Sequence, residues 1–326
     1  MIIDMHCDTL CEIRNLRKKG IACRMRDSKD ICCSLENLKK GSYTLQNFAV
    51  YIDLKEYPDP YENAMELVRI FEEEMKANED QVVQVRTAKE IDEAQKINKI
   101  AALLTLEEGG MCCGDIKKLE AFYEKGARMM ALLWNYQNEL GHPAALSPER
   151  ENEHQKRTCG LTKTGFEFLT AMESMGMIVD VSHLSDDGFY DVYENTKMPF
   201  VASHYNARAL CSHKRNLTDR MLQLFGERGC VAGLNYFPTF LADEPEKELC
   251  LEQIAQHAVH MMDCGGSGCV GLGSDFDGFN GDGRPENAAQ MDDVIWAFHK
   301  AVISDDTIDQ ILYGNVMRLY REVLRG

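Results

Sequence analysis

The sequence predicts an α/β fold in which parallel strands close into a (β/α)8 barrel of the TIM type. Eight short apolar runs alternate with longer amphipathic segments, and the runs are almost continuously apolar, as in parallel strands covered on both faces. No Pro-, Gly- or Ser-rich linker interrupts this alternation, and 326 residues is an ordinary length for one such barrel. We therefore expect residues 1–326 to form a single barrel domain, with an open, doubly wound sheet as the alternative.

The eight apolar runs define the predicted strands. They are rich in Val, Ile, Leu and Met, and their spacing leaves room for a helix after each strand. In chain order the predicted strands are Met1–Met5, Phe48–Ile52, Ala102–Leu106, Arg128–Leu133, Met177–Val181, Phe200–Ser203, Cys230–Leu234 and Cys269–Gly273.

Helix signals lie between these runs. Leu169, Met172 and Met175 form an apolar stripe that ends at Gly176, the residue type favoured just beyond a helix end. Ser304, followed by two aspartates, is typical of an N-cap and predicts the start of the last helix. The pattern as a whole is that of strands and helices in strict alternation.

The composition narrows the range of partners and compartments. The net charge is −17, and such a surface repels phosphate backbones and anionic lipid, so we expect neither nucleic-acid nor membrane partners. The N-terminal residues do not resemble a secretory signal, and no apolar run is long enough to cross a membrane. The 13 cysteines lie in apolar segments without a Cys-x-x-Cys pair, which indicates free thiols in a reducing compartment. We expect a cytoplasmic protein.

The first predicted strand ends in a His-x-Asp pair, and in β/α barrels the functional groups follow the strand ends. His6 and Asp8 are separated by one residue, so on an extended backbone their side chains point to the same side. Such a pair can bind one cation. A lone His beside an Asp is more often an ordinary hydrogen-bonded pair. The position of His6 and Asp8 at the end of a buried strand, however, favours a metal site.

Three further strand ends carry ligand types. Glu108 is followed by two glycines, which would let the chain turn away while the carboxylate faces the barrel axis, where it could bridge two cations. His183 and His204 end two successive apolar strands. One such histidine would more often be a structural core residue, but two of them together with the His-x-Asp pair predict a metal centre.

The last predicted strand is followed by Asp275. A carboxylate that lies close to metal ions without being fully committed to them can move a proton between water and a leaving amine. The competing interpretation is an aspartate that only shapes its turn. Asp277, two residues later, is the weaker candidate and could instead hold the loop. His257 and His260 lie in a predicted helix with no third ligand nearby in the sequence, so we expect structural or surface roles for them.

Six segments together resemble the membrane dipeptidase family in their order and spacing, over nearly the whole chain. They are Asp4–Asp8, Leu106–Gly110, Asp180–His183, Ser203–His204, Arg215–Asn216 and Gly271–Gly278. The resemblance implies a zinc-dependent hydrolase that cleaves dipeptides, including those with a C-terminal D-residue. It also implies two Zn²⁺ per chain, with Mn²⁺ or Co²⁺ as alternatives. In this scheme one ion is held by His6 and Asp8, the other by His183 and His204, and Glu108 bridges both.

The resemblance also implies roles around the metals. Asp275 would accept a proton from a water shared by the metals and pass it to the departing nitrogen. Arg215 would bind the C-terminal carboxylate of the dipeptide through its planar fork. Many family members carry a histidine after the fourth strand that stabilises the oxyanion. This sequence has Asn135 there, which can donate a hydrogen bond but cannot do so as a cation.

Two alternatives stay open. One is another barrel enzyme of the amidohydrolase type, such as an amidase, a lactonase or a deaminase, and the other is a metal-binding relative without catalysis. Arg215 and Glu108 favour the dipeptidase, and the presence of Asp275 argues against a loss of catalysis. The resemblance further suggests a homodimer. We expect the tract from Thr239 to Glu248 to form part of a loop at the substrate pocket.

Overall fold

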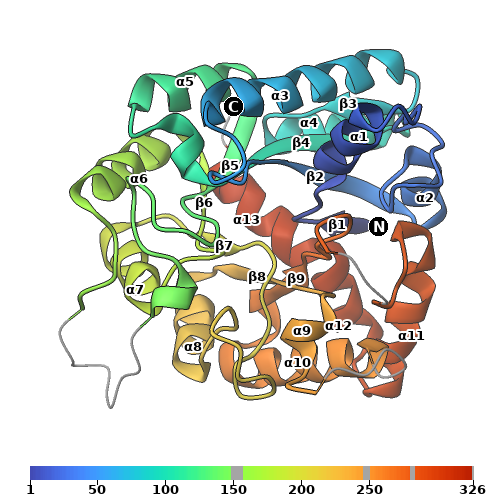
Figure 1. Ribbon diagram of the computed structural model, residues 1–326. Coiled ribbons are helices and arrows are strands. Elements are labelled where there is room, and N and C mark those ends of the chain that lie inside the picture. Colours follow the sequence, from blue (N-terminus) through green and yellow to red (C-terminus); the bar gives the residue numbers. More distant parts are fainter. Residues whose placement is uncertain (148–156, 245–249, 280–282, 325–326) are drawn as a thin grey trace.

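The computed structural model describes residues 1–147, 157–244, 250–279 and 283–324. Nine parallel strands are found within these residues, and eight of them close into a barrel because β1 pairs with β2 and β9 while β2 pairs with β4. Figure 1 shows the strands at the centre and the helices around them. The strands are β1 (Ile2–Asp4), β2 (Tyr43–Tyr51), β3 (Val82–Gln84), β4 (Ile100–Glu107), β5 (Ala127–Ala131), β6 (Ile178–Asp180), β7 (Val201–Ala202), β8 (Val231–Leu234) and β9 (Val270–Leu272).

Each of the eight predicted strands overlaps one barrel strand, so the barrel prediction is confirmed and the open sheet is wrong. The remaining strand, β3, was not predicted. It pairs with Ile100–Ala102 of β4, whereas β5 pairs with β4 from Leu104 onward. With only three residues between two helices, β3 is too short to show a periodic pattern in the sequence.

Helices follow the strands and cover the outside of the barrel (Figure 1). Two predicted boundaries are confirmed: Gly176 ends α6 with a φ of 69°, and Ser304 caps α12 by accepting a hydrogen bond from the N–H of Thr307. The helices are α1 (Thr9–Lys18), α2 (Leu35–Lys40), α3 (Pro60–Ala77), α4 (Ala88–Lys96), α5 (Ile116–Glu124), α6 (Lys163–Met175), α7 (Asp186–Asn195), α8 (Asp219–Arg228), α9 (Pro238–Leu241), α10 (Cys250–Gly265), α11 (Met291–Lys300), α12 (Asp305–Asp309) and α13 (Asn315–Val323).

Residues of β4 divide alternately between two apolar clusters. Ala102, Leu104 and Leu106 pack in the outer cluster, between the strands and the helices, whereas Ala101 and Leu103 belong to the inner cluster that fills the barrel. This alternation follows from the two-residue period of a strand. It means that odd-numbered residues of β4 face the barrel axis.

The N-terminal end of the barrel is closed by α13. Val316, Met317 and Tyr320 of this helix join the inner cluster, and the Tyr320 hydroxyl accepts a hydrogen bond of 2.7 Å from the side-chain amide of Asn47 on β2. Burying one such large apolar side chain contributes roughly 1.5–3 kcal/mol. The polar residues that follow the strands are therefore left at the opposite, C-terminal end.

Candidate active site

A cavity of about 410 Å³ opens at the C-terminal end of the barrel. Its lining comes from the segments that end or follow all eight barrel strands, so residues far apart in the sequence meet in one place. These lining residues include Asp8, Tyr51, Glu107, Asn135, His183, His204 and Asp275.

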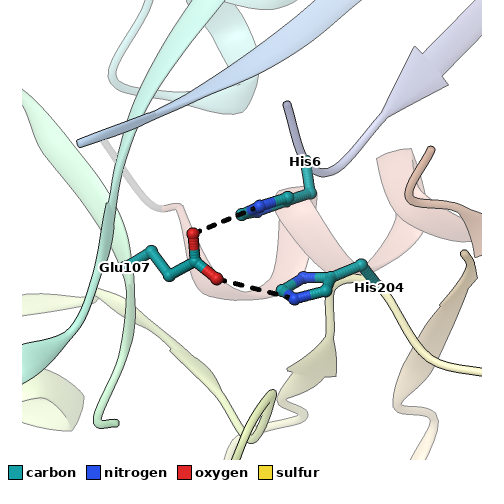
Figure 2. A group of neighbouring side chains, drawn as sticks. All are labelled: His6, Glu107 and His204. Carbon is teal, nitrogen blue, oxygen red and sulfur yellow. Dashed lines mark ion pairs between the residues drawn. The ribbon is translucent and has the colours of Figure 1, made fainter. Parts of the chain in front are cut away.

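The centre of the site is the carboxylate of Glu107, which lies between histidines from three strand ends. Its Oε2 atom lies 3.4 Å from Nε2 of His6, and its Oε1 atom lies 3.6 Å from Nε2 of His204 (Figure 2). The same Oε1 atom lies 2.9 Å from Nε2 of His183. Asp8 adds a second carboxylate, with Oδ2 at 3.3 Å from Nε2 of His6. Four of the five predicted ligands are thus brought together.

Glu108, the fifth predicted ligand, lies elsewhere. Its carboxylate accepts hydrogen bonds from the backbone N–H groups of Gly110 and Trp134 and from the side-chain amide of Asn138. These bonds hold the turn after β4 and the segment after β5 together. The structure therefore places Glu107 where Glu108 was expected.

The reason lies in the strand period and in the turn that follows. Glu107 is the last residue of β4 and shares its parity with Leu103, which faces the barrel axis. Glu108 has left the strand, with a φ of 94°. In the structure, odd-numbered residues of β4 face the barrel axis and even-numbered residues face the helices. The sequence does not reveal which set faces the axis, because a strand buried on both faces is apolar on both sides.

Positive backbone angles recur at the site. His183 has a φ of 69° and Asp275 a φ of 64°, a region that non-glycine residues rarely adopt. Strain of this kind costs on the order of 1–3 kcal/mol per residue and persists where the surrounding structure holds the residue in place. Both residues lie three positions beyond the end of a barrel strand and line the cavity.

The ring of His204 is held by a short chain of hydrogen bonds. Asp180 accepts bonds from the backbone N–H groups of Ser182 and Ser203 and from the Ser203 hydroxyl. Because that hydroxyl donates to Asp180, its oxygen is free to accept from Nδ1 of His204, at 2.8 Å. The proton on His204 is thereby assigned to Nδ1, and the Nε2 lone pair faces Glu107. Sequence reasoning did not assign these positioning roles to Asp180 and Ser203.

Burial and neighbouring charge perturb the titratable groups. Burial, together with the charges of His6 and Arg215, lowers the pKa values of His183 and His204 well below the ordinary value, which favours the neutral form of both rings. Burial also disfavours the charged form of His6, but the carboxylates of Glu107 and Asp8 outweigh it and raise the pKa of His6. Burial raises the pKa of Glu107 to about 7, with His6 opposing this shift and Asp8 reinforcing it.

These residues fit divalent cations. The Nε2 atoms of His183 and His204 lie only 3.0 Å apart, close enough for both nitrogens to bind one cation. Among the residues that the structure describes, Oδ1 of Asp8 is buried without a hydrogen-bond partner. Two sets of ligand atoms lie within 4.8 Å of one another: His6, Glu107 and His204, and His6, Asp8 and Asp275. Imidazole and carboxylate are the ligand types that zinc accepts.

Asp275 belongs to the second of these ligand sets and also has a partner outside it. Its Oδ1 atom is 3.8 Å from Nε2 of His6, and its Oδ2 atom accepts a hydrogen bond of 3.0 Å from the side-chain amide of Asn235. Burial raises the pKa of Asp275 to about 6, against the opposing effect of His6. Asp277, by contrast, accepts bonds from the Thr9 hydroxyl and the Cys32 N–H, so it holds the loop after β9.

Arg215 reaches the cavity with its guanidinium beside the ring of His183. Its Nη1 atom lies 2.8 Å from Nδ1 of His183, and its guanidinium carbon lies 5.2 Å from the ring centres of Tyr205 and Phe240. Within the described part of the chain, its buried Nε and Nη2 atoms have no hydrogen-bond partner. These two N–H groups form one edge of the planar fork, which can bind both oxygens of a carboxylate.

Asn135 contacts a histidine. Its side-chain oxygen lies 3.0 Å from Nδ1 of His183, so it can accept the proton on that nitrogen and orient the ring. Phe237 and Phe240 line the cavity, and Phe240 belongs to the tract from Thr239 to Glu248. The part of that tract from 245 to 248 lies outside the described residues.

The chain is similar to known dipeptidases in sequence and in fold. The family model of the membrane dipeptidases, peptidase family M19, matches residues 1–325. The dipeptidase aclJ of Aspergillus oryzae is 30% identical over 226 residues, which is 69% of this chain and 52% of that protein, so the match spans about half of its length.

Two solved structures share the fold. A crystal structure of the dipeptidase AC, a metallopeptidase, superposes with a TM-score of 0.88 at 23% identity, covering 99% of this chain and 98% of the other. A metallopeptidase from Rhodobacter sphaeroides, bound to a phosphinate mimic of the dipeptide L-Ala-D-Ala, gives a TM-score of 0.87 at 22% identity and covers 99% of both chains. In the described residues, no helix combines the length and the apolar character needed to cross a membrane.

Proposed function

The chain belongs to the membrane dipeptidase family, peptidase family M19, and from this premise we propose that it hydrolyses dipeptides with the help of two divalent metal ions. The observation that carries the proposal is the arrangement around Glu107, whose carboxylate faces His6, His183 and His204 at the mouth of a closed barrel. Zn²⁺ is the expected ion, with Mn²⁺ or Co²⁺ as alternatives, because mixed His and carboxylate sites discriminate poorly among these metals.

The proposed ligand sets come from the family resemblance, and the distances support them. His6 and Asp8 would hold one ion and His183 and His204 the other, with Glu107, in place of Glu108, contributing one oxygen to each. When bound, the ions would supply a water of lowered pKa and polarise the scissile carbonyl. The remaining groups of the site then position the substrate and move its proton.

Asp275 is the proposed proton carrier. It is held by Asn235 and lies near His6, so its carboxylate is positioned to accept a proton from the attacking water. The same carboxylate then gives the proton to the amine nitrogen of the departing amino acid. Asn135 would act through His183, by holding the orientation of that ring.

Arg215 is the proposed anchor for the substrate's C-terminal carboxylate. Within the described residues its Nε and Nη2 atoms have no hydrogen-bond partner, so they offer two parallel donors inside a buried site, where a charge-assisted bond is stronger than in water. An anchor near the metal ligand His183 would place the peptide bond that precedes the last residue at the metals. This selects the C-terminal peptide bond, which in a dipeptide is the single bond to be cleaved. The phosphinate mimic of L-Ala-D-Ala in the Rhodobacter sphaeroides metallopeptidase supports the extension to substrates with a C-terminal D-residue.

The test is a panel of L,L- and L,D-dipeptides, matched tripeptides and dipeptide amides, run together with metal analysis per chain. Chelator-sensitive cleavage of dipeptides, with little cleavage of tripeptides or amides, is the expected result. A protein that holds its metals but cleaves no dipeptide would move the substrate to another class, such as a cyclic amide or a lactone. A homodimer and a cytoplasmic location remain predictions, to be measured by light scattering and by fractionation.

A further inference from the structure

A second cluster of metal-ligating side chains lies on the outside of the barrel. Asp219 is the first residue of α8, and His260 and Cys264 lie one turn apart on α10, which packs against α8. Nε2 of His260 is 2.8 Å from Oδ1 of Asp219 and 3.5 Å from Sγ of Cys264. The three ligand atoms all lie within 4.8 Å of one another. His260 showed no third ligand in the sequence, but the fold supplies Asp219 from another helix.

The spacing of these atoms suits a tetrahedral ion. Zinc bonds to sulfur, nitrogen and oxygen are roughly 2.0–2.3 Å long, so ligand atoms around one ion lie roughly 3.3–3.6 Å apart. The distance from Cys264 to His260 is already within that range, and the distance from His260 to Asp219 needs only a small side-chain rotation. Residues four apart on a helix share one face, so His260 and Cys264 reach the same point without any distortion of α10.

We propose that Asp219, His260 and Cys264 form a binding site for a thiophilic divalent cation of the Zn²⁺ type, separate from the active site, with water as the fourth ligand. The ion would join the start of α8 to the last turns of α10. Burial and the neighbouring Asp219 raise the pKa of the Cys264 thiol, so binding displaces a proton. The chemistry excludes Mg²⁺ and Ca²⁺, which prefer oxygen ligands.

The site bears on the enzyme through the segment before α8. Arg215 lies four residues before Asp219, and the intervening chain is fixed by a backbone bond from Leu217 to Asn206. An ion at Asp219 would tie the end of this segment to α10. We expect occupancy to stabilise the fold by mass action, because the three ligands come together only in the native state.

A surface ion pair between Asp219 and His260 is the competing explanation. Such a pair needs no sulfur, whereas the ion-binding site needs the Cys264 thiolate. Co²⁺ distinguishes them, since a thiolate ligand gives a sulfur-to-cobalt charge-transfer band in the near ultraviolet that nitrogen and oxygen ligands do not give. The proposed active-site ligands are imidazoles and carboxylates, so they contribute no such band.

The experiment loads the full-length protein with Co²⁺ under reducing conditions and compares spectra, metal per chain and dipeptidase activity. In the wild-type protein we expect the thiolate band. In Cys264→Ser and in His260→Ala we expect the band to disappear and the metal content to fall by one ion per chain, with activity retained. Cys113→Ser, which removes an exposed thiol elsewhere, is the matched control and should keep the band.

Three outcomes would overturn the proposal: no band in the wild type, an undiminished band in Cys264→Ser, or loss of the band only in Cys11→Ser. The last result would assign the thiolate to the active-site cavity, which Cys11 lines. These readouts do not depend on the proposed hydrolysis. A failure of the dipeptidase assay with the band intact would count against the proposed function and leave this site standing.

Discussion

Glu107 and Glu108 are neighbours in the chain, yet their carboxylates have entirely different partners. Oε1 of Glu107 lies 2.9 Å from Nε2 of His183, whereas the carboxylate of Glu108 accepts bonds from two backbone N–H groups and from Asn138. The first residue ends a strand, and the second opens a turn with a φ of 94°. One glutamate therefore faces the metal site and the other holds the framework around it.

This contrast gives a matched pair of variants. Glu107→Gln should lower the metal content per folded chain and reduce the dipeptidase rate by more than roughly 100-fold, since the amide keeps only one of the two oxygens and loses the negative charge that bridges the ions. The Glu108→Gln protein should keep its metal content but lose roughly 1–3 kcal/mol of stability. The amide has only one acceptor oxygen, so one of the buried N–H groups that now donate to Glu108 loses its acceptor. Elemental analysis and urea unfolding measure the two effects. The reverse pattern would restore Glu108 as the ligand.

Ser203 should affect metal retention without touching a metal. Ser203→Ala removes the acceptor that holds the Nδ1 proton of His204, so we expect metal affinity to fall roughly 10- to 100-fold. Ser182→Ala is the control, because its hydroxyl contacts Ser203 and not His204. Activity is followed against increasing chelator concentration. Equal chelator sensitivity in the two variants would show that the Ser203 bond does not orient the ring.

Arg215→Lys should weaken substrate binding. A lysine cannot offer two parallel donors, and a hydrogen bond between charged groups contributes roughly 1.5–3 kcal/mol, so kcat/KM should fall roughly 10- to 100-fold, mainly through KM. Dipeptide amides provide the control, since they lack the carboxylate. If the variant loses as much activity on amides as on free dipeptides, Arg215 does not bind the C-terminus.

Asp275→Asn should slow the chemical step. An amide cannot accept the proton from water, and the loss of general acid–base catalysis typically costs roughly 10²- to 10⁴-fold in kcat. Metal content should stay unchanged, because His6, Asp8 and Glu107 still surround the first ion. Metal per chain is measured beside kcat. A loss of metal that parallels the loss of activity would make Asp275 a ligand.

His257 should make stability depend on pH. Burial lowers its pKa from 6.5 to about 4, and the neutral ring accepts from the Ala207 N–H and donates to the Leu241 carbonyl. Between pH 6.5 and 4 the unfolded chain binds a proton that the folded chain does not. Lowering the pH through this range therefore lowers the free energy of unfolding by up to roughly 3 kcal/mol. Above pH 6.5 this contribution is constant.

The measurement for His257 is urea unfolding at several pH values, in the wild type and in His257→Gln. The variant carries no titrating group at this position, so the difference between the two stability curves isolates the histidine. That difference should change between pH 6.5 and 4 and level off above. Parallel curves over this range would show that His257 titrates equally in the folded and the unfolded chain.

The alternation of apolar runs and helical segments was sufficient to predict the barrel. A closed parallel barrel brings the C-terminal ends of all its strands to one rim, so residues that follow different strands meet regardless of their separation in sequence. His6, Asp8, His183, His204 and Asp275 could be predicted as neighbours for this reason. The end of α6 at Gly176 and the start of α12 after Ser304 could also be predicted, because helix caps depend on a few adjacent residues.

The remaining features depended on tertiary structure. The side of β4 that faces the axis selects Glu107 over Glu108, and a strand buried on both faces carries no sequence contrast that reveals it. The hydrogen bonds that link Asp180, Ser203 and His204 join residues from two strand ends. The proposed site at Asp219, His260 and Cys264 joins residues from two helices. The sequence determines which residues lie at the rim, because strand order and chain direction set that position. Packing alone determines which way each side chain points, because orientation depends on neighbours that are distant in the chain.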